Sequence, residues 1–357
     1  MADNDSNFID PKLIPRRTLP SGESIPGIGM GTFGSDKYTS AEVSAAVAGA
    51  IRAGYRLFDC ASVYGNEDLI GVVFEDAFKK GTVKREELFI TSKVWNDMHG
   101  KGDVLLSLAK TLRDLRLDYI DAYLVHWPFP NYHSPGCDGD ARNPDSVPFS
   151  ADQFMKTWRQ MEHLADMGLA RYIGMSNMTI PKLRAVLPQC RIKPAVIEME
   201  LHPGFQQPEL FDYCVKQGIQ IIGYCPLGSP NRPERDKTPD DVIDTELPEV
   251  AAAAAAHGIH PVLVCLKWAV RHGHIPIPFS VHEKNYIANL RSVTEDPLTD
   301  AEMKAIAAAD KNCRLVKGQV FLWEGAGGWE DLWDIGKDSA VIQKLPYNYY
   351  PAFMIKE

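Results

Sequence analysis

The sequence predicts an α/β fold in which eight parallel strands close into a (β/α)8 TIM barrel. Short apolar segments alternate with segments of helical periodicity along the chain, as barrels require. No change in composition divides the alternation, so residues 1–357 are expected to form a single domain. We expect the barrel to cover about residues 19–310 and a C-terminal extension to cover 311–357.

The expected elements follow in a regular order. Residues 1–18 are polar, and a Ser-Gly turn at 21–22 predicts a small N-terminal hairpin. Strands are expected at 28–32, 55–59, 88–93, 119–126, 171–175, 195–199, 219–224 and 274–278. Helices are expected at 40–53, with Ser40 as the cap, and at 66–79, 102–115, 151–167, 180–188, 208–217, 247–257, 261–272, 283–290 and 299–309. A proline-rich insertion at 128–150 and a polar loop at 229–244 lack periodicity.

The composition narrows the class of protein. Hydrophobic residues make up 45% of the chain and charged residues 24%, and the formal net charge is −9. A chain with this charge offers no basic face to nucleic acid. The seven cysteines form no CxxC pair, which favours reduced thiols in the cytosol. The N-terminus lacks the features of a signal peptide, and the apolar windows are too short to cross a bilayer. We expect a cytoplasmic monomer or weak homo-oligomer with no membrane partner.

Reactive side chains stand at three successive strand ends. A buried strand ends at Asp59, and Tyr64 follows five residues later, before the next helix. The next two strands end at Lys93 and His126. The carboxyl ends of barrel strands meet around one cavity, so these four side chains are expected to face one site.

Six phrases around these residues resemble the aldo-keto reductase family in order and spacing. They are FDCASVYGNE, TSKVW, LVHWP, GMSN, ELHP and YCPLGSP. The resemblance runs from about residue 19 to about residue 298. It implies a barrel enzyme that transfers a hydride between NAD(P)H and a small-molecule aldehyde, ketone or alcohol.

The chemistry of carbonyl reduction gives each of the four residues a role. Nicotinamide supplies the hydride, and the protein must supply a proton to the carbonyl oxygen. A tyrosine with an ordinary pKa of about 10 is a poor donor unless its phenolate is stabilised. Lys93 can stabilise the phenolate of Tyr64, and Asp59 can keep Lys93 charged and in place. His126 can hydrogen-bond the carbonyl oxygen as charge develops there.

The resemblance also implies a set of cofactor contacts. Ser176 and Asn177 would hold the nicotinamide carboxamide, and the ring of Tyr224 would stack on the nicotinamide. The loop after Tyr224 would bind the pyrophosphate through backbone N–H groups. The complete predicted set is Thr32, Asp59, Ser176, Asn177, Glu198, Tyr224, Cys225, Pro226, Leu227, Ser229, Phe279, Ser280, Asn285 and Asn289.

Four positions depart from the family pattern. Cys225 replaces a serine in the phosphate loop, and Glu198 replaces a glutamine beside the carboxamide. A carboxylate at 198 would favour the oxidised, positively charged nicotinamide. Phe279 and Asn285 stand where NADPH-preferring members carry a lysine and an arginine for the 2′-phosphate. Each lost contact is worth roughly 1.5–3 kcal/mol, so we predict use of NADH, alone or with NADPH. Ser280, His282 and Lys284 can restore part of the NADPH grip.

Aromatic residues at Phe33, Trp95 and Trp127 match positions that surround the substrate in the family, although packing at the barrel rim would also explain them. The insertion 128–150 resembles a variable loop of the family. Its polar members favour a sugar-like or other polyhydroxylated substrate; they are His133, Asp138, Asp140 and Arg142. The tail at 320–333 is rich in tryptophan and glycine, and either a lid over the site or a tail packed on the barrel exterior would fit this composition.

Three other interpretations compete with this one. Gly29-x-Gly31-x-x-Gly34 fits a dinucleotide-binding fingerprint, but residues 35–40 separate it from the helix that such a loop should enter directly. A nucleotide-binding barrel can also serve as a regulatory or interaction subunit without turnover. A metal-dependent hydrolase is the third, although no histidines stand in an HxxxH pair and carbonyl reduction needs no metal, so none is expected.

Overall fold

Eight parallel strands form the centre of the molecule in the computed structural model, which describes residues 7–34, 37–133, 141, 143–230, 232–234 and 237–336. Each strand pairs with the next one along the chain. They are β3 (Met30–Gly31), β4 (Leu57–Asp59), β5 (Phe89–Val94), β6 (Ile120–Val125), β7 (Ala170–Ser176), β8 (Val196–Glu200), β9 (Gln220–Tyr224) and β10 (Ile275–Pro276).

Backbone hydrogen bonds join the first strand to the last. Gly29 N donates to Pro276 O at 3.0 Å, and Gly31 N donates to Pro278 O at 3.1 Å. The sheet therefore closes on itself, and the predicted (β/α)8 barrel is confirmed. Both edge strands are shorter than expected, because the prolines of the last strand have no N–H with which to extend the ladder.

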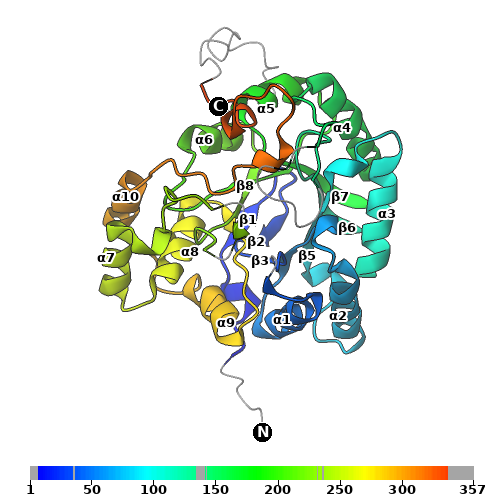
Figure 1. Cartoon of the computed structure of the whole chain (residues 1–357). Helices are drawn as coiled ribbons and strands as arrows, with labels where there is room; N and C mark the ends of the chain where they lie inside the picture. Colours follow the sequence, from blue (N-terminus) through cyan, green and yellow to red (C-terminus); the bar gives the residue numbers. More distant parts are fainter. Residues whose placement is uncertain are drawn as a thin grey trace.

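Helices surround the ring of strands (Figure 1). They are α1 (Ser40–Ala53), α2 (Glu67–Lys79), α3 (Asp103–Leu115), α4 (Ala151–Asp166), α5 (Ile180–Val186), α6 (Pro208–Lys216), α7 (Pro248–His257), α8 (Pro261–His272), α9 (Glu283–Ser292) and α10 (Asp300–Ala308). Their apolar faces pack on the outside of the strands in the main core cluster. No single helix in the described part of the chain has the length and apolarity to cross a membrane; by those two measures, α7 and α8 would pass only as a pair, bent by 98°.

Two local predictions were wrong in detail. Thr39, rather than Ser40, caps α1, because its hydroxyl accepts from Glu42 N while the Glu42 carboxylate accepts from Thr39 N at 2.8 Å. The helix expected at 180–188 ends as an α-helix at Val186 and continues as a 3₁₀ turn, Leu187–Gln189. Pro188 lacks the N–H that would continue the α-helix.

The predicted N-terminal hairpin is present as β1 (Arg16–Thr18) and β2 (Ser24–Pro26), which pair antiparallel. Leu19 and Ile25 from this hairpin pack with Leu57, Phe89 and other side chains inside the barrel. Leu57 and Phe89 lie at the amino ends of β4 and β5, so the hairpin closes that end of the barrel. The carboxyl ends of the strands remain for a site.

Candidate functional site

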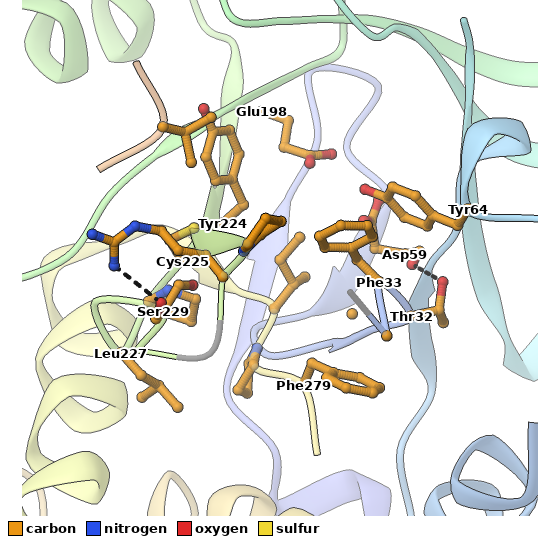
Figure 2. A pocket seen from close by; sticks show the side chains of 18 of the residues that line it. Thr32, Phe33, Asp59, Tyr64, Glu198, Tyr224, Cys225, Leu227, Ser229 and Phe279 are labelled. Atoms are coloured by element: carbon orange, nitrogen blue, oxygen red, sulfur yellow. Dashed lines mark hydrogen bonds between the residues drawn. The ribbon is translucent and has the colours of Figure 1, made fainter. Parts of the chain in front are cut away.

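A cavity of about 1,880 Å³ lies at the carboxyl ends of the strands and extends along the β9 loop toward α9 (Figure 2). All but one of the residues predicted for the site line it. They are Thr32, Phe33, Asp59, Tyr64, Trp95, His126, Trp127, Ser176, Asn177, Glu198, Tyr224, Cys225, Pro226, Leu227, Ser229, Phe279, Ser280, Asn285 and Asn289. Lys93 is the exception, because it is fully buried behind the cavity wall.

Lys93 and Asp59 form a buried ion pair between neighbouring strands. The Lys93 Nζ lies 2.7 Å from Asp59 Oδ1 and 2.6 Å from Oδ2, and it also donates to Cys60 O at 3.1 Å. Thr91 Oγ1 donates to Asp59 Oδ1 at 2.5 Å, which fixes the carboxylate further. The pair is therefore held rigidly on β4 and β5.

Tyr64 lies in front of this ion pair. It ends the 3₁₀ turn Ser62–Tyr64 that follows β4, and its ring centroid is 5.4 Å from Lys93 Nζ. The ring of His126, the residue after β6, lies 6.0 Å from the ring of Tyr64. Figure 2 shows Tyr64 beside Phe33 and above Asp59, facing the cavity. The four predicted catalytic side chains are thus brought together.

The charges of this group are set by burial and by Lys93. Burial raises the pKa of Tyr64 above its usual value, although the positive charge of Lys93 acts in the opposite direction. Burial and the nearby Lys93 charge hold the pKa of His126 well below its usual value, so its ring is neutral. Its Nδ1 has no hydrogen-bond partner among the described residues. A neutral imidazole facing a buried tyrosine can bind an uncharged polar group of a ligand.

Glu198 on β8 brings a second carboxyl group to the same lysine. Its Oε2 lies 3.4 Å from Lys93 Nζ, without hydrogen-bond geometry. Burial and the neighbouring Asp59 charge raise the pKa of Glu198 to about 8. The side chain therefore holds a proton at neutral pH, which differs from the negative charge expected from the residue type alone.

Asn177 connects the residues at the ends of β6, β7 and β9. Its Nδ2 donates to His126 O at 2.8 Å and to Ser176 Oγ at 3.1 Å. Its Oδ1 accepts from the Tyr224 hydroxyl at 2.6 Å. Asn177 has a φ of +58°, a backbone conformation that asparagine tolerates better than most residues. This network fixes the Tyr224 ring as one wall of the cavity.

The loop after β9 turns sharply. Cys225, Gly228 and Ser229 all have positive φ, and Gly228 N donates to Cys225 O at 2.9 Å. Arg232 donates to Ser229 O at 3.2 Å (Figure 2). A turn of this kind beside a cation suits an anionic ligand. The sequence interpretation missed Arg232 and Lys237, for which the charges in the loop 229–244 were the available signal. It also missed Lys37, which lies before α1 and lines the same cavity.

The far end of the cavity lies against α9. Asn285 Nδ2 donates to Ser280 Oγ at 3.3 Å. The Phe279 ring packs edge-on against the Tyr38 ring, with 5.8 Å between the ring centroids. Asn289 is buried on α9 and lines the cavity. Further cations line this end as well, at Lys37 and Lys284.

Aromatic rings form the wall near Tyr64, and the C-terminal segment supplies one of them. The centroid of the Phe321 ring lies 4.6 Å from that of Trp127 and 6.0 Å from that of Trp95. Phe321 belongs to an apolar cluster with other tail residues, and it lines the cavity. The described part of the tail therefore packs against the site, as the lid interpretation required; its role as a moving lid stays a prediction.

The insertion 128–150 is only partly described. His133 lines the cavity and packs near Trp95 and Phe321. Asp138, Asp140 and Arg142 lie outside the described residues.

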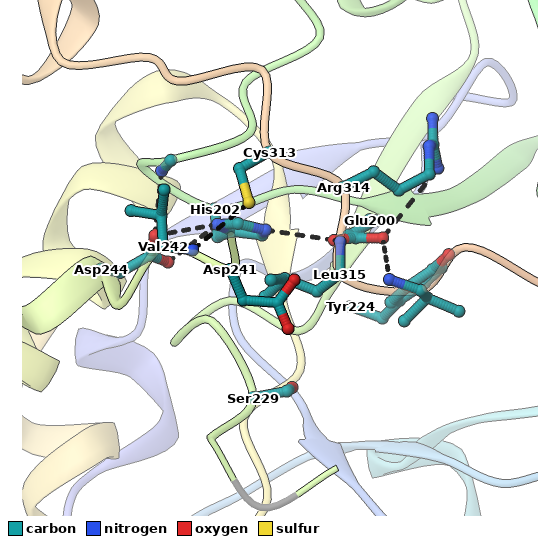
Figure 3. A network of polar contacts seen from close by, with 12 residues as sticks. Glu200, His202, Tyr224, Ser229, Asp241, Val242, Asp244, Cys313, Arg314 and Leu315 are labelled. Carbon is teal, nitrogen blue, oxygen red and sulfur yellow. Dashed lines mark hydrogen bonds and ion pairs between the residues drawn. The ribbon is translucent and has the colours of Figure 1, made fainter. Parts of the chain in front are cut away.

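A buried polar cluster beside the cavity was also missed (Figure 3). Glu200 accepts from Leu315 N at 2.6 Å and from Val316 N at 3.0 Å. The His202 ring contacts Glu200 at 3.2 Å and Asp244 at 2.9 Å. Glu200 and His202 belong to the ELHP phrase, to which sequence reasoning gave no role. Their partners are distant in the sequence, so no local sequence pattern predicts the cluster.

Among the residues that the structure describes, no three His, Cys, Asp or Glu side chains are grouped so that they could hold a metal ion.

Comparisons with known proteins give a consistent picture. The sequence profile of the "Aldo/keto reductase family" matches residues 27–311. The chain is 41% identical over 323 residues to "Aldo/keto reductase slr0942" of Synechocystis, a match covering 88% of this chain and 95% of that protein. It is 38% identical over 300 residues to mouse "Aldo-keto reductase family 1 member A1", covering 84% and 90% of the two chains. A crystal structure of a Bombyx mori aldo-keto reductase in complex with NADP superposes with a TM-score of 0.74 at 32% identity, covering 85% of this chain and 95% of the other. The chain belongs to the aldo-keto reductase family.

Proposed function

We propose that this enzyme, an NAD(P)H-dependent aldo-keto reductase, reduces a carbonyl group with Tyr64 as the proton donor. One observation carries the proposal. One cavity is lined by Tyr64, which has the Lys93–Asp59 ion pair behind it, and by the neutral His126 ring. The residues predicted to bind the cofactor line the same cavity. Family membership supports the reaction class, and the assignment of roles to these residues rests on their geometry.

The cavity fits a nicotinamide dinucleotide. Two buried polar atoms, Glu198 Oε2 and His126 Nδ1, lack hydrogen-bond partners among the described residues. Both belong to cavity-lining residues, so a ligand with polar groups can satisfy them. Ser176, Asn177 and Glu198 would hold the carboxamide, Tyr224 the nicotinamide face, the loop 225–229 the pyrophosphate and Asn289 the adenine. The related Bombyx mori enzyme was crystallised with NADP.

The bound nicotinamide supplies the hydride that adds to the carbonyl carbon. Tyr64 gives its hydroxyl proton to the carbonyl oxygen, and the Lys93 ammonium stabilises the phenolate that remains. Asp59 holds Lys93 in place and keeps it charged. The neutral ring of His126 can donate a hydrogen bond to the same oxygen and orient the carbonyl. The surrounding aromatic rings exclude water from the reaction.

Replacing the donor hydroxyl tests the mechanism. We expect Tyr64→Phe to lower turnover by about 10²–10⁴-fold, the usual contribution of a general acid, while cofactor affinity stays within about twofold. Turnover is followed as loss of NAD(P)H fluorescence over a panel of aldehydes and ketones. Tyr119→Phe, at a half-buried tyrosine that does not line the cavity, serves as the matched control. Unchanged turnover in Tyr64→Phe would refute the role of Tyr64, and cofactor binding without turnover in the wild type would indicate a regulatory protein.

We propose that the enzyme accepts NADH, alone or with NADPH. Asn285 and Phe279 carry no charge that could bind a 2′-phosphate. The Asn285 amide donates to Ser280, and the Phe279 ring packs on Tyr38. Lys37 and Lys284 line the same end and can oppose this preference. Titration of the protein with NADH and NADPH should give dissociation constants within about tenfold of each other, a difference below about 1.4 kcal/mol. Much tighter NADPH binding, by about a hundredfold, would contradict the proposal and point to the two lysines.

We propose a sugar-like or other polyhydroxylated substrate. Trp95 and Phe321 offer flat apolar walls to the carbon skeleton, while Tyr132 and His133 can hydrogen-bond hydroxyls. An aldose should show a higher kcat/KM than an unsubstituted aliphatic aldehyde of equal chain length, when both are corrected for the fraction of free carbonyl. The reverse order would contradict this substrate class.

A further inference from the structure

Two carboxyl groups share one lysine at the base of the cavity. Lys93 is fully buried and contacts Asp59 on β4 at 2.6 Å and Glu198 on β8 at 3.4 Å. Asp59 also accepts from Thr91, whereas Glu198 Oε2 accepts no hydrogen bond from the described residues. One ammonium cannot fully compensate two carboxylates, so one of the two is the natural holder of a proton. The geometry singles out Glu198, because it is the less well bonded.

Glu198 also faces the part of the cavity that would hold the nicotinamide ring. It lines the cavity together with Ser176, Asn177 and Tyr224, at the ends of the adjacent strands β7 and β9. In Figure 2, its carboxyl group lies between Tyr224 and Tyr64. A charge at this position therefore acts both on the bound ring and on the proton donor.

The other titratable groups around Glu198 keep one state near neutral pH. Burial raises the pKa values of Tyr64 and Tyr224. Burial lowers the pKa of His126, and the attraction of Asp59 and Glu198 outweighs burial to raise the pKa of Lys93. Asp59 accepts hydrogen bonds from Lys93 on both of its oxygens. Glu198 is thus the group of this cluster that can change its charge in the neutral to mildly alkaline range.

We infer that Glu198 determines which oxidation state of the nicotinamide the site prefers, with its neutral carboxyl favouring the reduced ring and its carboxylate favouring the positively charged oxidised ring. This inference rests on the proposed function. The neutral carboxyl has a donor as well as acceptors, so it can bond the carboxamide in the manner of a glutamine. The carboxylate places a negative charge near the oxidised ring and draws Lys93 away from the phenolate of Tyr64. Both effects make the alkaline form of the site better suited to alcohol oxidation.

The test compares the affinities for both oxidation states across pH. Dissociation constants for NAD⁺ and NADH, and for NADP⁺ and NADPH, are measured by protein fluorescence at intervals from about pH 6.5 to about pH 9.5. In the wild type, the affinity for the oxidised form relative to the reduced form should rise by at least about tenfold over this range. Taking the ratio removes the titration of the 2′-phosphate, which both NADP⁺ and NADPH carry.

The variant Glu198→Gln keeps the shape and the hydrogen-bonding groups but cannot ionise. Its ratio should stay constant across the range, at the value of the wild type at low pH. Glu162→Gln, at an equally buried glutamate of α4 away from the cavity, should keep the pH dependence of the wild type. The wild-type series tests the inference by itself if either variant does not fold.

Three results would overturn the inference. A ratio that does not change with pH in the wild type excludes a titrating group at the ring. A pH dependence that persists in Glu198→Gln assigns the titration to another residue. In both cases cofactor binding would still support the proposed function, whereas failure to bind any of the four nucleotides would remove the proposed function together with the inference.

Discussion

At the scale of the residue, the central feature is the arrangement of buried charges around Lys93. Its ammonium lies within 2.7 Å of both Asp59 oxygens, and Glu198, whose Oε2 lies 3.4 Å from Nζ, is its second carboxyl partner. The types and order of these residues were predictable from the chain, and so was their convergence at strand ends. The protonation of Glu198 was not predictable, because it depends on distances between side chains of three separate strands.

The raised pKa of Glu198 has a consequence for stability. A carboxyl with a folded-state pKa of about 8, above the unfolded value, makes a contribution to stability that is lost as pH rises from the unfolded value to about 8. Glu198→Gln has no such loss. We therefore expect its free energy of unfolding, relative to the wild type, to increase by at least about 1 kcal/mol between pH 5 and pH 9.

Urea unfolding of both proteins at the two pH values measures this difference. Glu162→Gln provides the comparison for a buried glutamate bonded to backbone N–H groups at 2.6 and 2.9 Å. An equal difference between Glu198→Gln and wild type at both pH values would contradict the prediction.

At the scale of the element, the end of β8 joins two segments that border the cavity. Glu200 binds the backbone of the C-terminal segment, and His202 joins Glu200 to Asp244 in the loop that precedes α7 (Figure 3). Asp244 in turn accepts from Gly204 N at 3.0 Å. The cluster therefore fixes both segments to the same strand.

His202 makes this junction sensitive to pH. Although burial lowers the pKa of His202, the bonds to Asp244 and Glu200 raise it to about 9. Its contribution to stability is fully present below the unfolded pKa of about 6.5 and is lost as pH rises through about 9. We expect His202→Gln to lose about 2–3 kcal/mol of unfolding free energy at pH 6 and distinctly less at pH 10.

Chemical denaturation at the two pH values checks this expectation, and limited proteolysis reports whether the loop 237–247 and the segment 311–320 become accessible. His163→Gln on the exposed face of α4 should cost less than about 0.5 kcal/mol. A pH-independent loss in His202→Gln would show that packing, and not the charged imidazole, holds the junction.

Element boundaries show how far local pattern reaches. The expected helix at 40–53 matches α1, and the shift of its cap from Ser40 to Thr39 follows from the Thr39–Glu42 capping box. The two strands at the barrel seam are shorter than the apolar runs that predicted them, because hydrogen bonding across the seam involves prolines 276 and 278.

At the scale of the whole molecule, the C-terminal segment completes a cavity that the barrel alone leaves open. Lys182 on α5 pairs with Asp334 at 2.6 Å and donates to Leu332 O at 2.7 Å. This contact holds the segment in the position where Phe321 packs on Trp127. The described part of the tail thereby adds an aromatic wall to the cavity.

Removing the aromatic ring of Phe321 should weaken substrate binding and leave cofactor affinity nearly unchanged. We expect Phe321→Ala to lower kcat/KM by about tenfold or more, mainly through a higher KM, because a buried aromatic contact is worth over about 1.4 kcal/mol. Cofactor affinity should stay within about twofold. Lys182→Met should act in the same direction by releasing the segment.

Steady-state kinetics and cofactor titration separate the two effects, and Phe8→Ala, at an exposed phenylalanine, is the control. An unchanged kcat/KM in both Phe321→Ala and Lys182→Met would show that the tail has no part in substrate binding.

The sequence by itself determined the barrel, its order of strands and the residues that line its carboxyl end, because strand and helix periodicity and strand-end residues are local properties. It placed Asp59, Tyr64, Lys93 and His126 together for the same reason. Only the tertiary structure decided the proton on Glu198, the junction at Glu200 and His202, and the position of Phe321 in the cavity wall. These depend on distances between segments far apart in the chain, and both electrostatic interaction and packing are set by such distances.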